Sequence, residues 1–206
     1  MFRELLCLPG GFDTPFAIAQ GYSTTKVFIK ENYTHPEIKS IIDHYHLQPL
    51  PVEGTLFVST YRSPQEYENG KPVGTAMIGM YCDEPRSVSL FHRLKYDEVW
   101  HFYGGDPLRL VLLYPDRTSK DAILGSDPTK GQFVQFVIPA GVWQAGHLLA
   151  GGGYSLFGCT VAPGFTGDIF EGGTREELLV MYPERAEDIN QLSVSGETKM
   201  PDGFAT

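Results

Sequence analysis

The sequence predicts an all-β protein, a jelly-roll barrel with a few peripheral helices. From Leu56 onward the chain is a series of short segments rich in β-branched and aromatic residues, separated by Gly, Pro, Asp or Asn. The 23 glycines and 15 prolines suit strands joined by tight turns better than a helical bundle. Because closing such strands into a barrel removes exposed sheet edges, the jelly roll is the expected arrangement.

The expected strands share a short length, β-branched or aromatic side chains and turn residues at both ends. They are Leu56–Arg62, Thr75–Cys82, Ser87–His92, Glu98–Tyr103, Leu108–Tyr114, Ala122–Leu124, Phe133–Ile138, Val142–His147 and Ser155–Val161.

Helices are expected on both sides of these strands. A first helix begins near Thr34, which can cap it, has Pro36 in its first turn and ends before Pro49. After the strands, Thr174 and Glu177 form a capping box for a second helix. A last helix runs from Pro183 through Leu192.

These elements predict one domain over residues 35–195. Residues 1–34 have no clear hydrophobic period, and we expect an extension that wraps the domain. Residues 196–206 are expected to form a frayed C-terminal tail.

Composition excludes several classes of partner. The net charge of −9 and the pI near 5.1 argue against nucleic acid and against anionic membrane surfaces. No apolar run approaches the roughly 20 residues of a membrane-spanning helix. Cys7, Cys82 and Cys159 are odd in number and widely spaced, which indicates reduced thiols in a cytoplasmic protein.

The stretch from Phe91 to Leu110 contains the first candidate site. Side chains alternate along a strand, so Glu98, Trp100 and Phe102 share one face. A carboxylate among aromatic side chains needs a partner or a wet pocket. The nearest partner in sequence is His92.

The same stretch resembles the first cupin motif, since His92, Glu98 and Gly105 match it and Leu94 replaces its second histidine. The segment IPAGVWQAG resembles the second motif, with Gln144 at the histidine position. The segments HRLKYDEVWHFYGGDPLRL and GCTVAPGF strengthen the resemblance. From about Pro36 to Leu192 the sequence is similar to one cupin family of uncharacterised function, the Cupin_5 type. The resemblance implies the cupin double-stranded β-helix.

Cupin barrels that hold a metal normally present three histidines and a glutamate, or two histidines and a carboxylate. Carried over by the resemblance, the set here is His92, Glu98 and Gln144. An amide is a poor donor compared with imidazole, so we expect no cofactor. A divalent metal on these three residues is the alternative.

The second interpretation is a metal-free pocket for a small-molecule ligand. His92 and Glu98 would be catalytic and Gln144 would orient the ligand. The apolar walls would be Trp100, Phe102 and Trp143, and Arg62 could bind an anionic group.

By analogy at the level of the fold, such a pocket suggests a sugar or nucleotide-sugar epimerase or isomerase with His92 as general base. Tyr61, Tyr103 and Tyr154 are available as acids. A metal-dependent oxygenase or isomerase and a non-catalytic binding protein, in which the polar groups simply satisfy one another, are the competing hypotheses.

Two further features bear on the site and its partners. The turn Glu53-Gly54-Thr55 resembles a Glu-Gly-Gly turn at the barrel mouth of the family, with Thr55 in place of the second glycine. Val99, His101 and Tyr103 form an outward row of their strand, and we expect a homodimer in which this row contributes.

Overall fold

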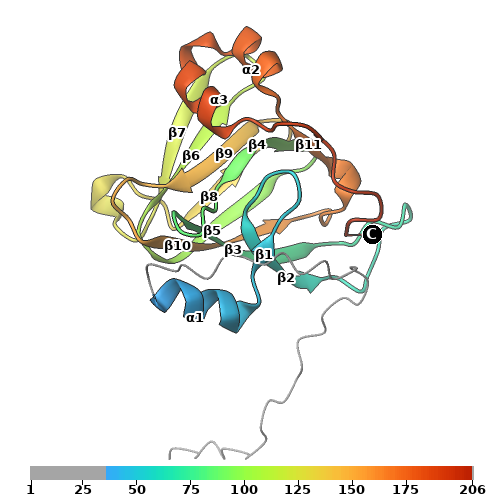
Figure 1. Ribbon diagram of the computed structural model, residues 1–206. Coiled ribbons are helices and arrows are strands. Elements are labelled where there is room, and N and C mark those ends of the chain that lie inside the picture. The colour runs from blue at the N-terminus through green and yellow to red at the C-terminus, as the bar shows by residue number, and fades with distance from the viewer. Residues whose placement is uncertain (1–35, 206) are drawn as a thin grey trace, which may run out of the picture.

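A computed structural model describes residues 36–205 and confirms the jelly roll. Two antiparallel sheets face each other (Figure 1). The first contains, in spatial order, β1 (Gln48–Pro49), β2 (Leu56–Arg62), β3 (Thr75–Cys82), β10 (Tyr154–Val161), β5 (Glu98–Gly105) and β8 (Gln135–Ile138). The second contains β11 (Phe170–Gly172), β4 (Ser89–Leu94), β9 (Trp143–Leu148), β6 (Leu108–Leu113) and β7 (Ser119–Leu124).

The space between the sheets is filled by the inward row of each strand. Phe157 of β10 lies between two other aromatic rings, with centroid distances of 4.5 Å to Tyr81 and 4.7 Å to Trp100. Leucines of β6 and β7 complete this core, including Leu110 and Leu124. Trp100 of this core lies beside the buried polar side chains of Glu98 and Gln144.

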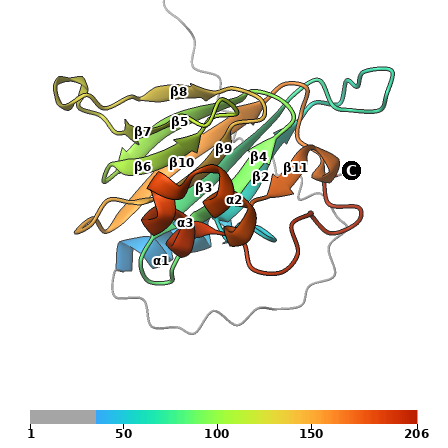
Figure 2. The same cartoon turned by 90° about the horizontal axis from the view of Figure 1, so that it is seen from above.

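Helices cover the outer faces of both sheets (Figures 1 and 2). Ile38 and Ile42 of α1 (Pro36–Tyr45) pack on the first sheet. Leu178 of α2 (Arg175–Met181) and Ile189 of α3 (Ala186–Leu192) pack with Trp143 on the second. Short 3-10 helices are η1 (Pro128–Lys130), η2 (Gly167–Ile169) and η3 (Pro183–Arg185).

Most predicted elements are confirmed within a few residues of their bounds. Thr174 caps α2, its hydroxyl accepting the Glu177 N–H at 3.4 Å. The predicted cap Thr34 and the predicted extension 1–34 lie outside the described residues. The sequence missed β1 and β11, which have only two and three residues and form by pairing with β2 and β4.

The prediction of a frayed C-terminal tail is wrong for the described part of that tail. Met200 and Phe204 are buried. The Gly172 N–H of β11 donates to the Thr198 carbonyl at 2.6 Å, and the Gly167 N–H donates to the Phe204 carbonyl at 3.0 Å. Burial of these two large apolar side chains favours docking of the tail on the barrel. The many polar and glycine residues of the tail, on which the prediction rested, do not reveal this effect.

Within residues 36–205, no helix combines the length and the hydropathy needed to cross a membrane.

The packing of α2 on the second sheet gives a prediction with a control in the same helix. Leu178 is fully buried, so Leu178→Ala should lower the free energy of unfolding by roughly 3 kcal/mol. Val180 is 82% exposed, and Val180→Ala should change it by less than about 0.5 kcal/mol. Urea denaturation followed by circular dichroism measures both, and equal effects would contradict the packing described.

Candidate functional site

The centre of the site is a buried ion pair between His92 and Glu53. His92 points inward from β4, and its Nδ1 lies 2.8 Å from the Leu90 carbonyl oxygen and 3.0 Å from Glu53 Oε2. A carbonyl only accepts, so Nδ1 carries the proton. Both His92 and Glu53 are 4% exposed. Among residues 36–205 no side chain or carbonyl bonds to Nε2, which leaves that nitrogen for a ligand.

Glu98 lies beside this pair and is hydrogen-bonded by the side chains of Gln144, Trp100 and Cys159. Gln144 Nε2 donates to Glu98 Oε2 at 2.8 Å, and Trp100 Nε1 donates to the same oxygen at 3.0 Å. The indole N–H also lies 3.1 Å from Gln144 Oε1. The bonds from Gln144 and Trp100 both fall on Oε2, so Glu98 Oε1 takes neither of them.

Electrostatics favour the charged form of His92. Burial lowers its pKa, but the charge of Glu53 and the hydrogen bond to it, with smaller contributions from Glu98 and the Leu90 carbonyl, raise the pKa to about 9. His92 is therefore an imidazolium at neutral pH. The pKa of Glu98 is raised by burial, which outweighs the opposing effects of His92 and Gln144.

The sequence predicted Glu98 as the direct partner of His92 and His92 as a base. In the structure the hydrogen-bonded carboxylate is Glu53, and the charge state makes His92 a proton donor at neutral pH. Glu53 was not among the predicted site residues, because strand periodicity says nothing about a turn residue. The signal was the family-like turn Glu53-Gly54-Thr55, in which Gly54 adopts a left-handed φ of 86°.

A chain of hydroxyl groups fixes the other oxygen of Glu53. Ser89 Oγ lies 3.4 Å from Glu53 Oε1 and also contacts the hydroxyls of Tyr81, at 2.6 Å, and Thr55, at 2.7 Å. All of these side chains are buried. The Tyr81 pKa is raised well above its ordinary value, mainly by burial and then by the Glu53 charge, so this phenol stays neutral and donates to Ser89.

The side chains predicted as apolar walls lie on opposite sides of the second sheet. Trp100 and the half-buried Phe102 belong to the core between the sheets. Trp143 does not, because it neighbours the inward Gln144 and therefore points outward. It packs under α2 and α3 with the Arg93 guanidinium 4.4 Å from its ring centre.

Several predicted polar candidates also lie away from His92. Arg62 donates to the Ala205 carbonyl at 3.1 Å and pairs with Glu66. Tyr61 and Tyr103 are more than half exposed, and the Tyr154 hydroxyl donates to Glu37 of α1 at 3.2 Å.

The donors in the barrel do not fit a transition metal. Leu94 is buried where a second imidazole is needed. The indole N–H of Trp100 occupies Gln144 Oε1 and Glu98 Oε2, and His92 offers only Nε2. No group of three or more His, Cys, Asp or Glu side chains in the described part of the chain has the geometry of a metal site.

The paired sheets and the two inward motifs define a cupin, a protein of the double-stranded β-helix class. The chain belongs to the Cupin_5 family, described as cupin superfamily (DUF985), whose model matches residues 39–172.

An uncharacterised protein of Saccharomyces cerevisiae is 30% identical over 159 residues, covering 68% of this chain and 79% of its own length. A Shewanella oneidensis protein of known crystal structure is 33% identical with a TM-score of 0.71, covering 77% of this chain and 98% of its own. A hypothetical protein from Leishmania major is 27% identical with a TM-score of 0.69, covering 76% and 98%.

The ion pair gives a direct prediction for the charge of His92. Glu53→Gln removes the charge that opposes burial, so the His92 pKa should fall from about 9 to its ordinary value of 6.5 or below. An NMR titration of the imidazole C–H signals measures this change. Glu171→Gln, at an exposed carboxylate of β11, is the control and should leave the His92 titration in place. An unshifted titration in Glu53→Gln would contradict the assigned pair.

Proposed function

We propose that this cupin binds a small organic ligand inside the barrel, beside His92, without a metal. The observation that carries the proposal is the free Nε2 of a buried imidazolium next to a second carboxylate, Glu98. A polar group of the ligand would accept the Nε2 proton. Small-molecule sites commonly combine apolar walls with a few converging polar groups, and Trp100 and Phe170 supply such walls.

Charge favours an unphosphorylated sugar or a similar polyol over a nucleotide-sugar. The cluster holds two carboxylates, Glu53 and Glu98, against one imidazolium. Among the described residues, no Lys or Arg bonds to these three side chains. A pyrophosphate would meet net negative charge there, whereas uncharged hydroxyl and carbonyl groups would not.

The same groups support proton transfer of the kind that isomerisation or epimerisation requires. Glu98 Oε1 would take a proton from the carbon next to a sugar carbonyl. The C–H electron pair would form the enolate, whose oxygen His92 Nε2–H would stabilise. Return of the proton to a carbon would complete the reaction without gain or loss of electrons. Binding without turnover is the second candidate, supported by the dense hydrogen bonding of Glu98.

The ligand experiment uses a panel of unphosphorylated aldoses and ketoses beside nucleoside-diphosphate sugars. Saturation-transfer NMR and thermal shift should detect binding of at least one unphosphorylated sugar. Glu98→Gln should weaken that binding about tenfold or more, since it removes a charge-assisted acceptor. Glu187→Gln, on the exposed side of α3, is the control.

Three results would overturn the proposal. They are binding of nucleotide-sugars alone, equal affinity in Glu98→Gln, and near-stoichiometric metal by elemental analysis of protein purified without chelators or a metal-affinity tag.

We also propose a homodimer, formed through the outer face of β5 and β8. Tyr103 and Val137 are each more than half exposed there. Since β8 is the last strand of its sheet, its outer edge can pair with a second copy. A cytoplasmic location is proposed with it, supported by the free, buried thiols of Cys82 and Cys159.

Light scattering after size-exclusion chromatography tests the dimer. The wild-type chain should have the mass of two copies at micromolar concentration. Val137→Glu should give monomers, because a charge would be buried in the interface. Val180→Glu, on the exposed side of α2, should remain dimeric. A monomeric wild-type chain would rule the dimer out.

A further inference from the structure

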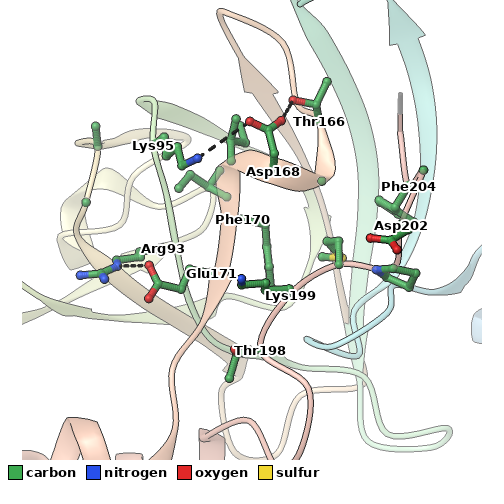
Figure 3. A pocket seen from close by; sticks show the side chains of 18 residues that line it. Arg93, Lys95, Thr166, Asp168, Phe170, Glu171, Thr198, Lys199, Asp202 and Phe204 are labelled. Carbon is green, nitrogen blue, oxygen red and sulfur yellow. Dashed lines mark hydrogen bonds and ion pairs between the residues drawn. The ribbon is translucent and has the colours of Figure 1, made fainter.

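An open cleft of about 850 Å³ lies at the end of the barrel nearest His92. Its walls come from the end of β4, from η2 and β11, and from the C-terminal segment 195–205 (Figure 3). In Figure 3 two ion pairs lie along the rim, Arg93 with Glu171 and Lys95 with Asp168, at 2.8 Å and 3.8 Å. Lys199 and Asp202 also line the cleft, so its walls carry three basic and three acidic side chains and no net charge, which suits an uncharged polar ligand.

Phe170 separates this cleft from His92. Its side chain lines the cleft, and its ring stacks on the His92 imidazole with a centroid distance of 5.2 Å and an interplanar angle of 16°. Phe170 is 4% exposed and so is His92. The Phe170 ring therefore covers the face of the imidazole on the side of the cleft, and a molecule of sugar size cannot reach His92 from the cleft while the ring stays in this place.

The C-terminal segment holds Phe170 in place from the other side. Met200 and Phe204 are buried in one apolar cluster with Phe170 and Leu94. The Phe204 ring also lies 6.4 Å from that of Phe57 on β2, so the segment bridges the two sheets across the mouth.

This segment is attached differently from the strands around it. The strands of the barrel are held by continuous ladders of main-chain bonds. Segment 195–205 is joined to the barrel by individual hydrogen bonds that do not form a ladder. Among them are the bonds from Gly172 to Thr198, from Gly167 to Phe204 and from the Arg62 guanidinium to the Ala205 carbonyl. It also lies beyond the part of the chain that matches the family, residues 39–172. Elements that are not held by a continuous ladder of main-chain bonds open at a lower free-energy cost than the central strands of a sheet.

We propose that segment 195–205 is a lid over the His92 site, that Phe170 is its gate, and that the cleft is the path by which an uncharged polar ligand enters. The proposal rests on the proposed function in that a ligand must reach His92. Opening would lift Met200 and Phe204 from Phe170, after which the Phe170 ring can leave the imidazole.

The experiment measures access to His92 without any sugar. Diethyl pyrocarbonate acylates neutral imidazole, and mass spectrometry of peptides gives the rate for each histidine. His44 and His46 are exposed and serve as internal references. The His92 titration is measured in each variant so that rates are compared at an equal neutral fraction.

In the full chain, the double variant Met200→Ala/Phe204→Ala should raise the His92 rate about tenfold or more, because the lid loses its apolar contacts. Arg62→Ala removes the bond to Ala205 and keeps the apolar cluster, and should raise the rate about threefold. Glu66→Ala is the matched control, since it removes only the Arg62–Glu66 pair and should leave the rate unchanged.

Unchanged His92 rates in Arg62→Ala and in a natively folded double variant would overturn the lid. If the double variant does not fold, Arg62→Ala alone decides. Faster acylation with no sugar bound by any variant would support the lid and count against the proposed function. Sugar binding to the wild-type chain with unchanged acylation rates would do the reverse.

Discussion

The buried pair of Glu53 and His92 is the interaction on which the site depends. Taking either ion alone out of water costs several kcal/mol, and removing one partner of such a pair costs about 3–5 kcal/mol. Hydrogen bonds around the pair help to offset this desolvation cost, because Ser89 positions Glu53 and Nδ1 of His92 also donates to a main-chain carbonyl. The turn 53–55 is thereby tied to β4, although the two are separated by more than thirty residues.

Strand register explains why the two motif regions meet. His92 of β4 pairs directly with Gln144 of β9, so their side chains leave the same face of the second sheet as neighbours. Glu98 begins β5 on the opposite sheet and reaches Gln144 across the barrel. The polar cluster is therefore assembled from both sheets, and small shifts in their spacing would change every contact in it.

The sequence predicted the fold and most strands because period-two alternation and turn residues are local signals. It placed Glu98 and Trp100 inward for the same reason. It failed for Trp143, since the wall was assigned by residue type although its neighbour Gln144 already fixed the parity. It also missed the role of Glu53, because which carboxylate bonds a histidine depends on contacts between distant segments. The docking of Met200 and Phe204 depends on a surface that exists only after the barrel has formed.

The family resemblance supplied the register of His92, Glu98 and Gln144 and the class of the fold. It did not supply the chemistry, because the residues that differ from the usual motif, Leu94 and Gln144, are those that would bind a metal. The protonation of His92 follows chiefly from the nearby charge and hydrogen bond of Glu53, which outweigh the opposing effect of burial on its pKa and exist only in the folded chain.

The two tryptophans of the chain lie on opposite sides of the second sheet. Trp100 donates its N–H to Glu98 in the interior, while Trp143 lies under the helices against the Arg93 guanidinium. Indole fluorescence depends on the polarity and charge around the ring. The protein therefore contains an intrinsic optical reporter for each compartment, and replacing the outer indole by phenylalanine would leave an emission that reports on the barrel interior alone.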